Sequence, residues 1–205
     1  MDNDSFAAEA KSFMDGFSPE DFMTKTVPLS HDDYALIGQL VQAYCWADFN
    51  GRRVLELLWS VNGTLFGRKA ASLRDGEVIK ELGIESEKLN GMPNLKIGLM
   101  HVFEILNMHK DRRHELAHWA ARKLKDLDAF LMLSKNIKEG NRRGIDICSE
   151  LDDDDDFVGY AVMPIQELRD ECEKLYHHNE YLARSVKFLT DHLEGLHAGP
   201  NVKID

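Results

Sequence analysis

Apolar side chains recur at helical spacing along most of the chain. The first repeat consists of apolar residues three and four positions apart: Leu36, Ile37, Leu40, Val41 and Tyr44. Such spacing places one face of a helix against a core. Ser30 followed by Asp33 resembles a capping box, so we expect a long helix from there to about Ser60, with Asn50-Gly51 as a candidate kink.

Two further helices are expected before the middle of the chain. One spans about residues 64–82, and Gly83 and Asn90-Gly91 supply stop signals after it. The next begins at Pro93, because proline is favoured in the first turn of a helix. Its apolar stripe consists of Leu95, Leu99, Val102, Phe103 and Leu106. We therefore predict that this third helix ends near Asn107.

The last predicted helix is the most regular element of the sequence. From Ile165 to Leu196 the seam residues alternate at intervals of three and four, as in a heptad repeat. Leucine occupies every d position: Leu168, Leu175, Leu182, Leu189 and Leu196. The flanks include Tyr176 and Ala183 in place of a full set of charges, which favours packing inside a helical bundle over a free coiled coil. Aspartates precede this helix where a basic leucine zipper needs lysine and arginine, so that class is excluded.

Two apolar runs, residues 129–134 and 157–163, predict a β-hairpin before the last helix. Leu116, Ala120, Leu124, Leu127 and Leu131 would also continue a helix, so this region fits two patterns. The polar connection between the runs contains glycines and the aspartates Asp152 to Asp156. That run lacks the central glycine and the later glutamate of an EF-hand, which favours a solvated loop over a calcium site. The expected fold is mainly α: a helical bundle with a small β-hairpin before a long C-terminal helix.

Composition is that of one globular domain. Of 205 residues, 43% are hydrophobic and 30% are charged, which is too apolar for wholesale disorder. We expect an N-terminal extension over residues 1–29, a helical domain over 30–197 and a tail over 198–205. No run approaches the roughly 18 apolar residues of a membrane span, and the acidic N-terminus does not resemble a signal peptide, so a cytoplasmic location without membrane contact is expected. Three widely spaced cysteines predict reduced thiols.

The net charge of the chain limits the classes of molecule that it is expected to bind. A net charge of −11 argues against indiscriminate binding of nucleic acids or anionic membranes, which need a positive field. Between Lys110 and Lys125, however, six basic residues face two acidic ones, a local excess of four positive charges. The most basic stretch coincides with the segment DRRHELAHW, Asp111 to Trp119.

This segment contains a zinc-protease pattern. In HELAH, His114 and His118 stand one helical turn apart as metal ligands, and Glu115 is placed as general base. A third ligand is required, and no metzincin continuation follows His118. Glu139 lies at a suitable distance along the chain, but its surroundings, KEGNRRG, are typical of a turn.

The same letters contain a second pattern, in which an arginine, a polar residue, three variable residues and a histidine follow the third helix. Here these residues are Arg113, His114 and His118. With the order of elements over roughly residues 31–195, the pattern resembles the HEPN family. The resemblance implies a compact helical bundle, often a homodimer, and a metal-independent endoribonuclease without cofactor, acting as a toxin or antiviral effector. His114 stands where asparagine is commonest in the family.

The chemistry of RNA cleavage suits these side chains. It needs a base, an acid and positive charge on the phosphorane, and histidine and arginine supply these functions. His118 and Arg113 are the expected central groups, with Arg112, Lys110 and His109 as candidate phosphate contacts. One His118 cannot readily serve as both acid and base. A homodimer that brings two copies of His118 together would supply both groups. Residues five apart on a helix diverge by about 140°, so Arg113 is expected at a helix start or across the dimer seam.

A third interpretation assigns no catalysis. DRRHELAHW would then be an ordinary solvated helix start, and the chain would be a helical dimerisation or binding module, for instance the partner of an enzyme encoded elsewhere. An antitoxin or effector protein is a further candidate partner. The RNA target and the identity of any partner are not encoded in a recognisable motif.

Overall fold

The structure, a computed structural model, describes residues 21–64, 69–134 and 159–197. These residues form two compact units, and three long helices contribute residues to both. One unit contains residues up to Gly38 and from His114 to Asp170, and the other contains Gln39–Arg113 and the chain from Glu171.

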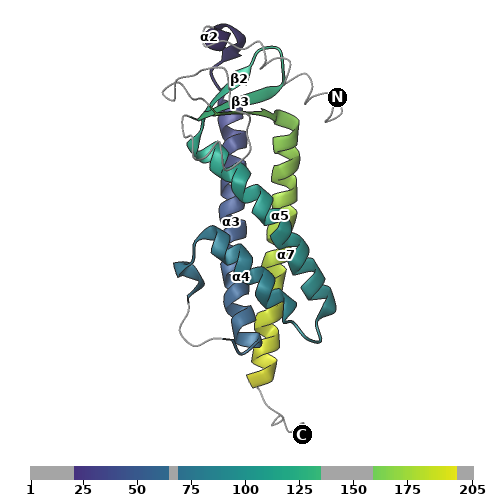
Figure 1. The fold of residues 1–205 in the computed structure, drawn as a ribbon. Helices are drawn as coiled ribbons and strands as arrows, with labels where there is room; N and C mark the ends of the chain where they lie inside the picture. Colours follow the sequence, from purple (N-terminus) through teal and green to yellow (C-terminus); the bar gives the residue numbers. More distant parts are fainter. Residues whose placement is uncertain (1–20, 65–68, 135–158, 198–205) are drawn as a thin grey trace. The chain divides into compact units, whose positions relative to one another are not determined.

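The first unit is built around a four-stranded antiparallel sheet in the order β1-β2-β3-β4. Its elements are α2 (Asp21–Lys25), β1 (Thr26–Val27), β2 (Ala120–Leu124), β3 (Ala129–Ser134) and β4 (Gly159–Pro164) (Figure 1). β3 and β4 pair over their full length, which confirms the hairpin predicted from the two apolar runs. The connection between them, including Asp152 to Asp156, lies outside the described residues.

The ambiguous stretch after Trp119 is a strand. Arg122 of β2 pairs with Leu131 of β3, and Thr26 of β1 pairs with Leu124 at the other edge of β2. Buried residues on these elements form the local core: Leu124, Leu127, Ala129 and Leu131. Leucines spaced by three and four residues fit a helix stripe as well as two short strands and their turn, so periodicity alone did not distinguish the two.

The second unit is helical. It contains most of α3 (His31–Val61), the 3₁₀ turn Ala70–Ser72, α4 (Asp75–Glu87), most of α5 (Pro93–His118) and most of α7 (Ile165–His197) (Figure 1). A mainly α fold with a small sheet before a long C-terminal helix is therefore confirmed. None of the described helices is long and apolar enough to cross a membrane.

Hydrogen bonds between side chains fix the helices of this unit to one another. Nδ2 of Asn50 donates to Oδ1 of Asn179 over 2.6 Å, which joins α3 to α7 in a buried position. Arg52 joins α3 to the 3₁₀ turn and to the first residue of α4. Three seam leucines of α7 in this unit, Leu175, Leu182 and Leu189, are fully buried. The heptad pattern therefore packs within one chain, as the bundle interpretation expects.

Two helix boundaries differ from those expected. The helix predicted over residues 64–82 begins only at Asp75, where the Glu77 carboxylate accepts a hydrogen bond from the backbone N–H of Arg74, and it continues past Gly83 to Glu87. The prediction that the third helix ends near Asn107 is wrong, because α5 continues to His118. Residues 108–118 contain no proline or glycine, so nothing in them interrupts a helix.

Candidate functional site

The segment that contains both motifs is the C-terminal end of α5. Arg113 and His118 lie on one continuous helix, and the backbone N–H of Trp119 closes it on the carbonyl of Glu115 over 2.8 Å. The expectation of a helix start for Arg113 is therefore wrong. His118 is the basic residue in the last turn of α5.

In the sheet-containing unit, His114 and His118 form a pair of aromatic rings. Their centroids are 4.6 Å apart and the ring planes are inclined by 53°. His118 is exposed and His114 is partly exposed, because the two belong to the outer face of the helix end. The inner face buries Glu115 and Leu116, which are 7% and 8% exposed. The pair of imidazoles is therefore the accessible part of the motif in this unit.

The basic residues that follow the motif have structural partners in the same unit. Nε of Arg122 donates to the hydroxyl of Thr26 over 2.7 Å. Nζ of Lys123 lies 3.6 Å from a carboxylate oxygen of Asp33 and 3.4 Å from one of Asp128. Part of the positive charge counted along this stretch is thus neutralised within the fold, and the positive field around the motif is weaker than the sequence suggests.

Asp33 shows how those contacts affect the start of α3. Burial alone would raise the pKa of its carboxyl, but hydrogen bonds from the side chain and backbone of Ser30, together with the charge of Lys123, lower it overall. The Ser30–Asp33 pair therefore caps α3 as the sequence predicted, with N–H to Oδ2 and hydroxyl to Oδ2 distances of 2.8 and 2.7 Å.

In the helical unit, Arg113 lies near Tyr44 of α3. Burial raises the pKa of the Tyr44 hydroxyl, as do Asp75 and Asp48, and the positive charge of Arg113 acts in the opposite direction. Nε of Arg113 is buried and has no hydrogen-bond partner among the described residues. Burial of a polar group without a hydrogen-bond partner is unfavourable.

His109 is an interior residue of the helical unit. It is 1% exposed, and its Nδ1 lies 2.7 Å from Oε2 of Glu171 on α7. Burial would raise the pKa of Glu171, but the contact with His109 and the charge of Arg112 lower it overall. Direct contact between His109 and a phosphate would require this side chain to leave the interior.

The two remaining candidate phosphate contacts are more accessible. Lys110 and Arg112 are partly exposed. Nζ of Lys110 donates to Oδ1 of Asn107 over 3.0 Å and lies 4.0 Å from Asp111. Both side chains belong to the same unit as Arg113, so the three form a basic segment on α5.

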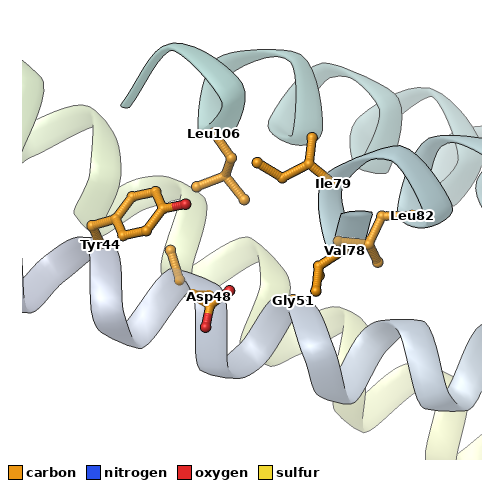
Figure 2. A pocket seen from close by; sticks show the side chains of 8 residues that line it. Tyr44, Asp48, Gly51, Val78, Ile79, Leu82 and Leu106 are labelled. Atoms are coloured by element: carbon orange, nitrogen blue, oxygen red, sulfur yellow. The ribbon is translucent and has the colours of Figure 1, made fainter. Parts of the chain in front are cut away.

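A small pocket lies between α3, α4 and α5 in the helical unit (Figure 2). The hydroxyl of Tyr44 and the carboxylate of Asp48 are its polar groups, and Leu106 and Val78 are among its apolar ones. The volume of about 10 Å³ suits one water molecule. A nucleotide does not fit into this pocket.

The described residues contain no group of three or more histidine, cysteine, aspartate or glutamate side chains arranged to hold a metal ion. Glu139, the third ligand considered for HELAH, lies outside the described residues.

Two contacts of the candidate site were not evident from sequence. Glu171 is one of many charged positions on a regular helix, and Tyr44 belongs to the apolar stripe of α3. Their proximity to Arg112 and Arg113 depends on how the helices pack, for which a single sequence has no local signal. Comparison with protein-family models, with curated proteins and with solved structures gives no match.

Proposed function

We propose that this chain is a metal-independent endoribonuclease or RNA-binding protein of HEPN type. The observation that supports it most is the pair of accessible imidazoles, His114 and His118, at the end of the helix that also contains Arg113. Histidines titrate near neutral pH and can exchange protons with RNA hydroxyls, and the guanidinium matches phosphate oxygens in a two-point contact. Lys110 and Arg112 add positive charge along the same helix.

Arg113 and His118 diverge by about 140° around α5 because they are five residues apart on a helix. A site that uses both side chains on one phosphate is therefore most readily formed by Arg113 of one chain and His118 of another. This geometry supports the homodimer that the HEPN resemblance implies. The roles of toxin or antiviral effector, with an antitoxin or effector protein as partner, belong to the same proposal.

The burial of Glu115 favours this function over the zinc protease. In a HExxH protease the glutamate must reach a metal-bound water, whereas the Glu115 residue is 7% exposed. The two histidines are accessible where the glutamate is not, which suits chemistry performed by the imidazoles themselves.

One observation favours a second candidate function, a non-catalytic binding module. On α3, Trp46 and Phe49 are each 51% exposed, and their ring centroids are 5.8 Å apart in an edge-to-face arrangement. The guanidinium carbon of Arg53 lies 5.7 Å from the Phe49 ring centroid. Exposed aromatic side chains that cluster in this way are typical of interaction surfaces.

An RNA-cleavage assay in EDTA, combined with metal analysis of the purified protein, tests the proposal. We expect cleavage of an unstructured RNA of mixed sequence in EDTA and no stoichiometric metal. Stoichiometric zinc with no EDTA-resistant cleavage would instead support the protease. A protein that neither cleaves RNA nor contains metal would support the binding module.

A further inference from the structure

We propose that three histidines between α5 and α7 make the contact of these helices sensitive to acid, so that the two helices separate in the helical unit as the pH falls below neutral. The three are His101 and His109 of α5 and His178 of α7, and we call them the histidine cluster. The inference concerns a conformational switch in the fold and does not depend on the proposed ribonuclease function.

The histidine cluster lies within an antiparallel contact between α5 and α7. Near the start of α5, the hydroxyl of Tyr181 donates to the carbonyl oxygen of Leu95 over 3.4 Å. Farther along α5, Nδ1 of His109 lies 2.7 Å from Oε2 of Glu171. Between these contacts, the ring centroid of His178 is 6.2 and 6.1 Å from those of the other two histidines. A change in the charge of the cluster therefore acts on the interface that holds the two helices together.

Two members of the cluster are withdrawn from solvent. His109 is 1% exposed and His178 is partly exposed, whereas His101 is exposed. Nε2 of His109 and Nδ1 of His178 are buried without a hydrogen-bond partner among the described residues. A proton added to such an imidazole creates a buried charge, which is unfavourable unless a carboxylate or water compensates it. The carboxylate at the cluster, that of Glu171, lies beside His109.

The surrounding charges also oppose protonation of His178. The groups that do so are imidazoles and an amine from both helices: His101 and His109 on α5, and Lys174 and His177 on α7. From α3, the amide of Asn50 meets α7 at Asn179, next to His178, and it has no charge. Burial, followed by the charges of those neighbours, lowers the pKa of His178 to about 4.

This lowered pKa gives the sign of the effect. When the helices separate, the imidazole of His178 regains water and titrates near its usual pKa of 6.5. Above that value it is neutral in both forms, and the packing has its full stability. Below it the separated form binds a proton that the packed form does not, so separation becomes more favourable until the pH reaches the lower pKa. After a discount for the partial exposure of His178, we expect the opening constant to rise about tenfold between pH 7 and pH 5.

Amide hydrogen exchange of the full chain, followed by mass spectrometry in EDTA at these two pH values, measures the opening constant. Rates are corrected for the intrinsic effect of pH on exchange. We expect opening to increase about tenfold in residues 99–109 of α5 and 171–182 of α7, and to change much less in α4. No increase in the two helices would overturn the inference, and so would an equal increase in α4, because the whole unit would then open.

A histidine variant tests whether the cluster causes the effect. His178→Gln removes the titrating imidazole and keeps a neutral polar side chain, so most of the increase in opening should disappear. The matched control is His192→Gln, at a partly exposed position about four turns farther along α7, which should keep the wild-type increase. An increase of wild-type size in His178→Gln would overturn the inference.

Titration of the wild-type imidazoles by NMR does not depend on whether any variant folds. The chain has nine histidines, and we expect one ring resonance to titrate with a midpoint far below 6.5, in agreement with the pKa of about 4 for His178. A set of nine resonances without such a midpoint would overturn the inference. RNA cleavage is not a readout in any of these experiments, so their failure would leave the proposed function intact.

Discussion

Replacement of Arg52 tests the account of the helical unit. Nε of Arg52 lies 2.8 Å from Asp48, and Nη2 lies 3.0 Å from Asp75. Nη1 donates to the carbonyl oxygens of Ala70 and Leu73 over 2.8 and 2.9 Å. The side chain is 20% exposed, so these contacts are partly shielded from solvent.

The contributions of these four contacts to the free energy of unfolding are not additive, and partial exposure to solvent weakens the two ionic contacts. At about 0.5–1.5 kcal/mol for each neutral acceptor and somewhat more for the carboxylates, Arg52→Ala should lower the free energy of unfolding by about 2–4 kcal/mol. Arg52→Lys should recover only part of this, since an ammonium group cannot reproduce the forked geometry. The matched control is Arg53→Ala at the exposed neighbouring position, with an expected loss under about 1 kcal/mol.

Urea unfolding followed by circular dichroism measures all three variants. The slope of free energy against urea should not change, because the substitutions alter stability and not the surface exposed on unfolding. If Arg52→Ala is no more destabilising than Arg53→Ala, Arg52 does not fix the 3₁₀ turn and α4 to α3 as described.

Three further predictions concern the same unit. Asn179→Leu should lower the free energy of unfolding by about 1–3 kcal/mol, because it leaves the buried Asn50 amide unpaired, and it should not change the oligomeric state. Urea unfolding and sedimentation measure the two effects, and a broadened set of oligomers would place the α7 seam between chains. The pKa of the Glu85 carboxyl is lowered overall, since hydrogen bonds to the carboxylate outweigh burial, so Glu85 contributes its full stabilisation above its usual pKa of 4.5 and loses it as pH falls through the lower pKa of the folded state. Glu85→Gln should therefore flatten the fall of the free energy of unfolding at acid pH, and an unchanged fall would contradict this. A Cβ atom at Gly98 would overlap the hydroxyl of Tyr181, so Gly98→Ala should destabilise the wild-type protein. In a Tyr181→Ala background the same substitution should stabilise the helix by about 1 kcal/mol, as measured by thermal unfolding. Equal effects in both backgrounds would refute the contact.

The presence of the helices was predictable from apolar residues that recur over several turns, although two helix boundaries were not. The seam of α7 was identifiable because leucine recurs every seven residues over many turns, and the start of α3 because Ser30 and Asp33 form a local capping pattern. Both signals lie within one element. The hairpin of β3 and β4 was likewise predictable from two apolar runs bounded by polar residues.

Features that depend on contacts between distant parts of the chain were less predictable from the sequence. β1 has two residues, Thr26 and Val27, and its pairing with β2 has no local signature. The end of α5 lies beyond the predicted one because the apolar stripe stops at Leu106 while the basic motif after it is compatible with a helix. The contact of His109 with Glu171 joins positions 62 residues apart, so the burial of this candidate phosphate contact had no local signal in the sequence.

The sequence drew attention to Arg113, His114 and His118 as a motif but did not predict their arrangement. Because the helix continues through the motif to His118, the His114 and His118 rings lie in contact, with centroids 4.6 Å apart. This contact depends on where α5 ends, and the pattern of apolar residues placed that end too early.

The contrast among three single variants tests the central claim most directly. Initial rates of RNA cleavage in EDTA are compared for His118→Ala, Arg113→Ala and Glu115→Gln, with circular dichroism to verify that each variant is folded. We predict that the first two abolish cleavage and that Glu115→Gln retains most of it, because the imidazole and guanidinium act on the phosphate and the buried carboxylate does not. Loss of activity in Glu115→Gln with activity retained in Arg113→Ala would contradict the account and support the zinc-dependent mechanism.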